Sequence, residues 1–373
     1  MKIGLIILAA GYSERMGVLK PLLPVGGESA LSRAVSLGKI EKVHSISVVT
    51  GFRCDDVEAE LNLSHAKNIR HVFNSRFTEG MFSSVKAGIH SLPSDLDGFF
   101  LLPVDNCAVK PETIEKLIAA FILGNAEDVI YPTFDGQRGH PPLIPYSFAA
   151  ELKSYDGEDG MRGYLSQFPA DEVEVDDKGV VMDMDTPQEY EALLRHLGLP
   201  TYPDEKTGSQ LLEKYGTPEN IIAHGRQVNE LALRIAGHLG KKGVAVDKGL
   251  LSSACLLHDI VRLNPDHEIA GAKLLLTEGY PGTALLVAAH MDLPEEYTPK
   301  PDALALLYLA DKLCRDGKIV ALEITREELK SRYADNPEAL GHAEDRLSRA
   351  LAIADMLRTR FGITDLGIPA SQI

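Results

Sequence analysis

The first half of the chain alternates short apolar runs with segments in which apolar positions recur every three or four residues. The apolar runs, which predict buried strands, cover 3–9, 45–50, 98–104 and 128–132. The helical spacing covers 28–39 and 111–123. Strands that alternate with helices form βαβ units, with helices on both faces of a mainly parallel sheet. We therefore expect a three-layer, Rossmann-like α/β domain over 1–197.

The second half of the chain has only the helical spacing, without the alternation that is typical of strands. It starts after PTYPDEKTGS (200–209), a stretch rich in Pro, Gly and charged residues that is typical of a linker. The predicted helices cover 210–215, 219–239, 247–259, 267–278, 282–290, 301–315 and 325–360. We expect a linker over 198–209 and an all-α domain over 210–373.

Composition and charge narrow the classes of function. The 373 residues are 45% hydrophobic and 25% charged, which is ordinary for a globular protein of two domains. A net charge of −16 argues against binding to nucleic acid or to an anionic membrane surface. A local basic pocket for a small anionic substrate is compatible with that charge.

The cysteines and the N-terminus predict the compartment. Cys54, Cys107, Cys255 and Cys314 form no CxxC pair, so we expect reduced thiols in a cytoplasmic protein. The apolar start IGLIILAA is too short to span a bilayer and leads into a charged turn. We expect neither a transmembrane helix nor a signal peptide.

The stretch LAAGYSERMGVLK (8–20) follows the first predicted strand and combines two glycines with two cations. Gly11 and Gly17 allow a tight turn and a close approach of backbone N–H groups to a ligand, while Arg15 and Lys20 add charge beside that turn. Backbone donors with Arg and Lys are typical of a triphosphate site. GxxxxGK[ST] and GxGxxG are both absent, which excludes a Walker loop and disfavours a Rossmann dinucleotide site. A tight turn with two solvated cations is the alternative.

Three carboxylates are candidate metal ligands in the same half. Asp105 follows the predicted strand FFLLPV, and Asp183 and Asp185 in VVMDMDTP lie two residues apart, on one face of an extended chain. Phosphoryl and nucleotidyl transfer use Mg²⁺, which binds a few carboxylates and neutralises phosphate charge. A lone Asp at a strand end is alternatively a helix cap, but the neighbouring glycine and cation pattern favours the metal interpretation.

The second half carries its own candidate metal ligands. They are His224, His258, Asp259, His267, His290 and Asp311. Neighbouring positions on a helix point about 100° apart, so His258 and Asp259 share one ion only near a helix end. The pair follows the apolar run LLSSACLL, and its burial is costly unless a metal compensates it. For any one histidine, a packed or surface side chain is the alternative.

The opening LAAGYSERMGVLKPLLP resembles the LAAGxSxRMGxxK opening of molybdenum cofactor cytidylyltransferases, which are MobA-like members of the glycosyltransferase-A-like (GT-A) nucleotidyltransferases. Further segments that resemble the family, in its order, are NSRFTEGMFSSVKAGI (74–89), LLPVDN (101–106), YPTFDGQRGHPPLI (131–144), DGEDGMRGYL (156–165) and VVMDMDTPQEYEAL (180–193). The resemblance covers essentially all of 1–197. It implies a GT-A/Rossmann-like nucleotidyltransferase in which the terminal phosphate of molybdopterin attacks the α-phosphate of a nucleotide and pyrophosphate leaves.

The resemblance also implies roles for single residues. Gly11, Arg15 and Lys20 would hold the triphosphate, and the two cations would stabilise charge on the leaving pyrophosphate. Asp105 and Asp185, with Asp183 beside them, would hold Mg²⁺. The other contacts that it implies are those of Leu8, Ala9, Ala10, Gly17, Gly80 and Ser84 with the nucleotide, and those of Arg138 and His140 with the pterin. A packed loop histidine is the alternative for His140.

The choice of base depends on Ala10. Cytidylyl members of the family carry LAAG, as here, whereas guanylyl relatives carry LAGG, and the added methyl narrows the pocket toward a pyrimidine. One methyl is worth about 1–3 kcal/mol of discrimination, so CTP is favoured and GTP stays open. The family often has Gly-Asp-Gln-Pro where this chain has Val104–Asp105–Asn106–Cys107, so contacts around the metal-binding Asp differ.

The second half resembles the HD-domain phosphohydrolases over 217–320. Their order of His, then His-Asp, then a distal Asp is matched by His224, His258–Asp259 and Asp311. His267 in DHEIAGAKLL and His290 in VAAHMDL resemble the extra histidines of members with two metals.

This second resemblance implies Fe²⁺, Mn²⁺ or a similar divalent ion, which activates water for attack on a phosphate ester. Arg262 or Lys312 would bind the substrate phosphate. The substrate stays open between a nucleotide by-product, a cofactor intermediate and an unrelated dinucleotide.

Together these features predict a bifunctional enzyme of molybdenum cofactor maturation, a cytidylyltransferase joined to a metal-dependent phosphohydrolase. One alternative is a nucleotidyltransferase for another phosphorylated substrate, against which RGHPPLI and MDMDTPQEY count. The other is a chaperone that carries the cofactor to a molybdenum hydroxylase apo-enzyme, with a sensor HD domain. A full set of metal ligands counts against a pure carrier.

Overall fold

The computed structural model describes residues 1–63, 68–157, 159–315 and 317–364, so Glu158 of the matched segment 156–165 and the last nine residues of the expected all-α domain lie outside it. The described chain divides into two compact units, Met1–Leu199 and Pro200–Ile373. Each unit has a hydrophobic core of its own.

The first unit is built on an eight-stranded sheet with the order β3-β2-β1-β4-β7-β5-β6, in which β8 pairs with β5. The strands are β1 Ile3–Ala9, β2 Val43–Thr50, β3 Ile69–Phe73, β4 Gly98–Pro103, β5 Val129–Phe134, β6 Gln137–Arg138, β7 Leu143–Pro145 and β8 Ala170–Glu174. The four consecutive strands β3, β2, β1 and β4 run parallel, whereas β7 is antiparallel to both β4 and β5. The sheet is therefore mixed but mainly parallel.

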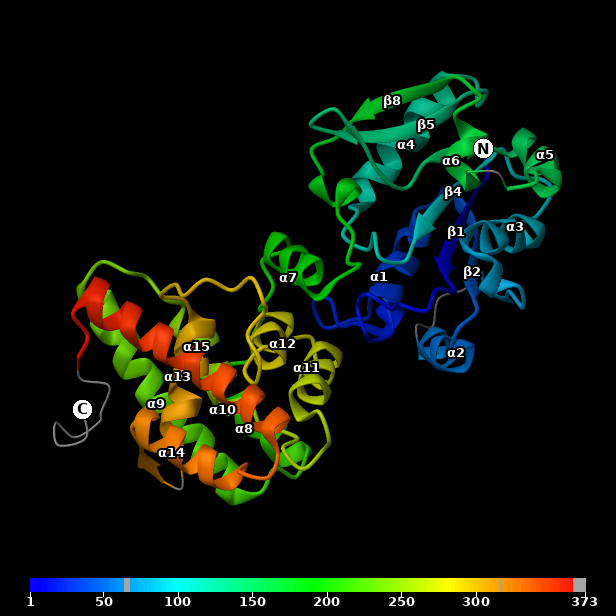
Figure 1. Ribbon diagram of the computed structural model, residues 1–373. Helices are drawn as coiled ribbons and strands as arrows, with labels where there is room; N and C mark the ends of the chain where they lie inside the picture. The colour runs from blue at the N-terminus through cyan, green and yellow to red at the C-terminus, as the bar shows by residue number, and fades with distance from the viewer. Residues whose placement is uncertain (64–67, 158, 316, 365–373) are drawn as a thin grey trace. The chain divides into compact units, whose positions relative to one another are not determined.

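Helices cover both faces of this sheet. They are α1 Ala30–Ser36, α2 Cys54–Leu63, α3 Met81–Ser91, α4 Pro111–Leu123, α5 Ala149–Ser154, α6 Gly160–Leu165 and α7 Pro187–His196. Because side chains alternate along a strand, those of β1 divide between the two faces: Leu5 and Ile7 pack in the core with α1, α2 and α4, and Ile6 packs with α3, α5 and α6. Figure 1 shows β1 and β2 between α1 and α3. The expected three-layer α/β architecture is confirmed.

The second unit is mainly helical. Its elements are α8 Glu205–Lys214, α9 Glu219–Lys241, α10 Lys248–Leu257, α11 His267–Thr277, α12 Pro281–Ala288, α13 Ala303–Leu313, β9 Cys314–Arg315, β10 Lys318–Ile319, α14 Leu322–Arg332 and α15 Pro337–Phe361. On α9, Val228, Leu231, Ile235 and Leu239 recur at three and four residues and are buried against α10 and α13. The predicted helical domain is confirmed (Figure 1).

Two details of the second unit differ from expectation. The hairpin of β9 and β10 interrupts the helices, where the sequence indicated no strand. Helix α8 begins at Glu205, inside the stretch expected as a linker, because the Asp204 side chain accepts a hydrogen bond from the Thr207 N–H at 2.7 Å and caps the first turn. Among the described residues, no helix combines the length and the apolar character that crossing a bilayer requires.

Candidate active sites

The glycine and cation turn leaves the sheet at the carboxyl end of β1. Ser13 (φ 58°) and Gly17 (φ 76°) are its left-handed positions, and the Gly17 N–H donates to the Ser13 carbonyl at 2.9 Å. Gly11 does not have a positive φ, and a Cβ added there would meet nothing within 4 Å. The left-handed conformation that requires glycine is therefore found at Gly17, and the missing side chain of Gly11 leaves open space beside the turn.

Lys20 brings together carboxylates that are far apart in the sequence. Its Nζ donates to Asp105 Oδ2 at 2.7 Å and also to Asp185. Asp185 accepts a second hydrogen bond from the guanidinium of Arg15. Asp105 follows β4, directly beside β1 in the sheet, because parallel strands end at the same edge. The side chain of Lys20 is 13% exposed, whereas Arg15 is largely solvent-accessible.

The carboxylates of this site differ in their pKa. Burial opposes ionisation of Asp185, but the hydrogen bond and charge of Lys20, with those of Arg15, outweigh it and hold the pKa of Asp185 below its usual value. Burial and the nearby charges of Glu189 and Asp185 raise the pKa of Asp183. A cation would relieve this repulsion among carboxylates.

Glu189 joins the site although the sequence interpretation did not include it. Asp183, Asp185 and Glu189 each offer an oxygen within 4.8 Å of the others, a group that fits a metal ion, and Asp105 does not belong to this group in the described chain. Glu189 also closes a capping box at the start of α7 with Thr186. The signal in the sequence was the spacing Thr-Pro-Gln-Glu, which predicts such a cap.

The other expected nucleotide and pterin contacts lie on separate segments. Leu8, Ala9 and Ala10 are buried at the end of β1. Gly80, with φ 97°, directly precedes α3, and Ser84 on that helix is buried and accepts a hydrogen bond from Asn74 at 3.0 Å. The remaining two, Arg138 and His140, are exposed, and Arg138 donates to Glu172 at 2.6 Å.

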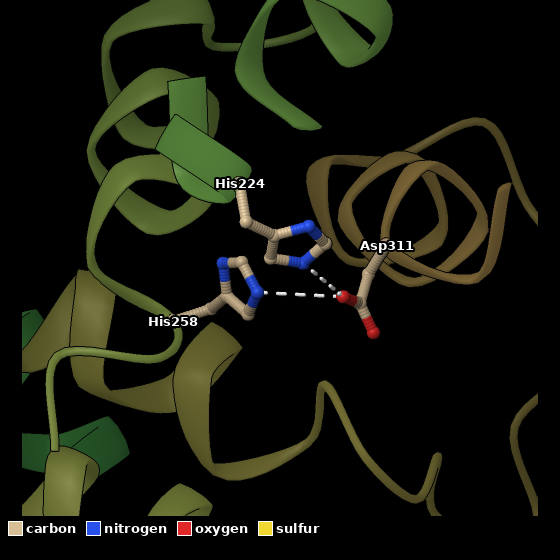
Figure 2. A group of neighbouring side chains, drawn as sticks. All are labelled: His224, His258 and Asp311. Atoms are coloured by element: carbon tan, nitrogen blue, oxygen red, sulfur yellow. Dashed lines mark hydrogen bonds and ion pairs between the residues drawn. The ribbon is translucent and has the colours of Figure 1, made fainter. Parts of the chain in front are cut away.

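The second site gathers side chains from five parts of the helical unit. His224 comes from α9 and Asp311 from α13, and the Asp311 Oδ1 atom lies 3.1 Å from His224 Nε2 and 3.4 Å from His258 Nε2, as Figure 2 shows. Helix α10 ends at Leu257, so His258 and Asp259 stand at a helix end where both side chains reach the same centre. Two consecutive residues can share one ion only near a helix end, and His258 and Asp259 lie at such an end.

The donor set at this centre fits a divalent metal ion. The Nδ1 atoms of His258 and His290 donate to backbone carbonyls at 2.9 and 2.7 Å, which leaves the Nε2 lone pairs aimed at the centre. Both Nε2 atoms and Asp259 Oδ1 are buried without a hydrogen-bond partner among the described residues. Two groups have metal-binding geometry, His224–His258–Asp311 and His258–Asp259–His290.

His267 lies at the edge of this centre. Its Nε2 atom is 3.1 Å from Asp259 Oδ1, but it also accepts a hydrogen bond from Arg262 Nη1 at 2.5 Å. Although burial opposes their ionisation, the surrounding cations and histidines hold the pKa of Asp259 and of Asp311 well below the usual range. Asp259 and Asp311 are therefore ionised before any metal binds, and the cations of Arg262 and Lys312 lie beside them.

Lys312 stands beside the metal-binding group. Its Nζ donates to Asp311 Oδ2 at 2.7 Å and to the His290 carbonyl at 3.2 Å. A cavity of about 1030 Å³ opens on His224, Asp259 and Asp311. Metal ligands, a cation and space for an organic molecule are the components of a site for phosphate esters.

Comparison with known proteins divides the chain in the same way. The MobA-like NTP transferase domain matches residues 5–175, and the HD domain matches residues 221–316. The chain is 26% identical over 185 residues to the molybdenum cofactor cytidylyltransferase of Escherichia coli (strain K12), covering 50% of this chain and 92% of that protein. It is 30% identical over 138 residues to tRNA (cytidine(56)-2′-O)-methyltransferase of Thermoplasma volcanium, covering 32% of this chain and 39% of that protein.

A solved structure also resembles the chain. A protein of Mycobacterium tuberculosis H37Rv aligns with 52% of this chain and 98% of its own, at 24% identity and a TM-score of 0.45. The first match includes Lys20 and Asp105 but ends before Asp183, Asp185 and Glu189, whereas the second includes His224, His258–Asp259 and Asp311. The chain contains a MobA-like NTP transferase domain over residues 5–175 and an HD domain over residues 221–316, and both domains indicate an enzyme.

Proposed function

We propose that the first unit transfers CMP from CTP to the terminal phosphate of molybdopterin or of the molybdenum cofactor. A phosphate oxygen of the cofactor forms a bond to the α-phosphorus of CTP, the bond from that phosphorus to the bridging oxygen breaks, and pyrophosphate leaves with the electron pair. The observation that carries the proposal is Lys20, which holds Asp105 and Asp185 together beside the turn that follows β1. Similarity to the E. coli cytidylyltransferase supports this choice of substrates.

Different residues of the first unit bind the triphosphate, the nucleotide and the pterin in this proposed reaction. Arg15 and Lys20 bind the triphosphate, and their charge opposes the charge that develops on the leaving pyrophosphate. The nucleotide sits beside Gly11, where no side chain fills the space, and on the start of α3. Arg138 and His140 contact the pterin. The attacking oxygen belongs to the cofactor, so no side chain acts as nucleophile.

Mg²⁺ at the carboxylates supplies further neutralisation of the phosphate charge. Asp105, Asp183 and Asp185 are the proposed ligands, and Glu189 completes the acidic group. The methyl group of Ala10 would favour the smaller cytosine over guanine by about 1–3 kcal/mol. The product would pass to a molybdenum hydroxylase apo-enzyme. Free thiols at the four cysteines are compatible with a reducing compartment such as the cytoplasm.

We propose that the second unit hydrolyses a phosphate ester with Fe²⁺, Mn²⁺ or a similar ion. His224, His258, Asp259 and Asp311 hold the ion, with His290 as a further ligand. The ion supplies the charge that activates water for attack on phosphorus. Lys312 and Arg262 hold the substrate phosphate.

Mass spectrometry of reaction products tests the first proposal. Purified protein is incubated with molybdenum cofactor, Mg²⁺ and either CTP, GTP or ATP. We expect a cytidylylated pterin and pyrophosphate with CTP, lost in Asp105→Asn and retained in Asp176→Asn, which replaces an exposed aspartate away from the turn. Retained cofactor without transfer from any nucleotide would contradict the proposal and favour the carrier alternative.

Phosphate release from a panel of nucleotides and simple phosphate esters tests the second proposal. The protein is loaded separately with Mn²⁺ and Fe²⁺, and Asp311→Asn serves as the inactive control. We expect metal-dependent release that this variant abolishes. No release from any ester with either ion would contradict the proposal.

A further inference from the structure

The cavity at the metal centre has a wall that lies outside the HD match. The match ends at residue 316, and helices α14 and α15 follow it. Both helices contribute side chains to the same cavity of about 1030 Å³ that His224 and Asp311 line. Sites for small organic molecules run to about 300–1,000 Å³, so this cavity has room for far more than a phosphate group.

One face of α14 is turned to the cavity. The side chains that it contributes are Thr325, Glu328, Leu329 and Arg332, spaced by three, one and three residues. This spacing places them on a single helical face. Helix α15 adds Arg346 and Leu347 and packs against both α13 and α14 (Figure 1).

Cations line this cavity in a chain whose net charge is −16. Most of them are engaged with the protein. The recorded contacts are Lys312 with Asp311, Arg346 with Asp292, Arg315 with Glu328, and Arg262 with His267 and Asp259. Arg332 differs, because the described chain records no ion pair for it, and its guanidinium lies 6.0 Å from the ring centre of Tyr333.

Arg332 and Tyr333 therefore present a cation and an aromatic ring to the cavity, apart from the groups that hold the metal. A guanidinium without a carboxylate partner binds phosphate oxygens through charge-assisted hydrogen bonds. An aromatic ring at the same wall provides a surface for a flat base. The apolar side chains of Leu329 and Leu347 lie on the same two helices.

We propose that the cavity binds a nucleotide with two or more phosphates, and that Arg332 is the specificity-determining residue for the phosphate distal to the one that is hydrolysed. The inference rests on the proposed function of the second unit as a phosphohydrolase and adds its class of substrate. The metal centre holds the reacting phosphate, and Arg332 binds the second one. A phosphate ester without a second anionic group has no group for Arg332 to bind.

Hydrolysis of two probes tests this inference in the full-length, Mn²⁺-loaded protein. The probes are ADP, which has a second phosphate, and p-nitrophenyl phosphate, which has none. We expect Arg332→Gln to raise the KM for ADP about tenfold, the loss of one charge-assisted hydrogen bond, with kcat within about twofold. The KM for p-nitrophenyl phosphate stays unchanged, and Arg332→Lys recovers most of the affinity for ADP.

Arg326→Gln is the matched control. Arg326 lies on α14 but is not among the side chains that line the cavity, so its loss removes the same charge from the same helix without affecting KM. An equal KM for ADP in wild type and Arg332→Gln, or an equal rise for both probes, would overturn the inference.

A binding measurement separates this inference from the proposed function. Calorimetry measures ADP binding in a Lys20→Gln background, which removes the triphosphate cation of the first unit. Binding that weakens about tenfold in Arg332→Gln but not in Arg326→Gln supports the inference even without turnover. Absence of hydrolysis with every probe and ion contradicts phosphohydrolase activity, whereas unchanged binding contradicts the role of Arg332.

Discussion

Lys20 shows how much one side chain contributes to the first site. Its ammonium is mostly shielded from water and contacts carboxylates from two segments, one after β4 and one before α7. It also helps to hold the pKa of Asp185 below its usual value. A single cation thus holds together two carboxylates that are far apart in the sequence.

Lys20→Gln is expected to reduce nucleotidyl transfer by about 10²-fold or more, because a stabilising donor for the leaving pyrophosphate is lost. Pyrophosphate release with CTP and molybdenum cofactor measures the effect. Lys39→Gln, which changes an exposed lysine, should keep the wild-type rate. A rate for Lys20→Gln near that of the control would exclude a role for Lys20 in the reaction.

At the scale of elements, helix ends place the functional side chains. Helix α10 ends at Leu257, so that His258 and Asp259 lie directly after it at the candidate metal centre. Helix α7 begins with a capping box directly after Asp185. Both ends were readable in outline from the sequence, as an apolar run before His-Asp and as Thr-Pro-Gln-Glu. What the spacing did not reveal is that Glu189, the capping residue, also faces Asp183 and Asp185.

Thr186→Ala should lower the free energy of unfolding of the first unit by about 1 kcal/mol, because the Glu189 N–H loses its side-chain partner. Chemical denaturation measures the change, and Thr186→Ser, which keeps the hydroxyl, should remain near wild type. If Thr186→Ala unfolds like wild type, the cap does not stabilise α7.

The end of α11 is tied to α8 by an ion pair whose effect depends on pH. Burial alone would raise the pKa of Glu278, but hydrogen bonds from Lys214 and Tyr215 outweigh it and lower that pKa from its ordinary value of 4.5. A lowered pKa in the folded state means that the stabilisation is present above pH 4.5 and is lost as the pH falls through the folded value.

Glu278→Gln should therefore reduce the unfolding free energy of the second unit by about 0.5–1 kcal/mol at pH 7, a modest effect because Lys214 is more than half exposed. The difference from wild type should shrink as the pH approaches about 3. Denaturant titrations at several pH values measure it, with Glu213→Gln, an exposed neighbour, as control. A difference in unfolding free energy that grows toward acid pH would contradict a stabilising Lys214–Glu278 ion pair.

At the scale of the whole molecule, the described chain has two units, and each has a hydrophobic core and a candidate site of its own. The ligands of the helical centre all come from α9 through α13 and the loops between them. Because the side chains of each candidate site belong to one unit, we expect substitutions in the full chain to separate the two proposed reactions.

Asp105→Asn should abolish nucleotidyl transfer and leave metal-dependent phosphate release intact, and Asp311→Asn should do the reverse. Asp311→Asn should also lower the metal bound to the second unit, because it removes a ligand that contacts both His224 and His258. Parallel assays of both activities, with metal content by mass spectrometry, test this independence. Loss of both activities in either variant would indicate coupling between the units.

The sequence by itself predicted the α/β unit, the helical unit and the histidines and carboxylates of the candidate sites apart from Glu189, because buried strands, amphipathic helices and metal ligands leave local patterns. The short or edge strands β3, β7 and β8 were not predicted, since few of their residues are apolar or their runs are brief. The position of Arg332 on a cavity wall was equally beyond a local pattern. The pairing of these strands and the position of Arg332 depend on contacts between segments that are distant in the sequence. Only the tertiary structure decided them.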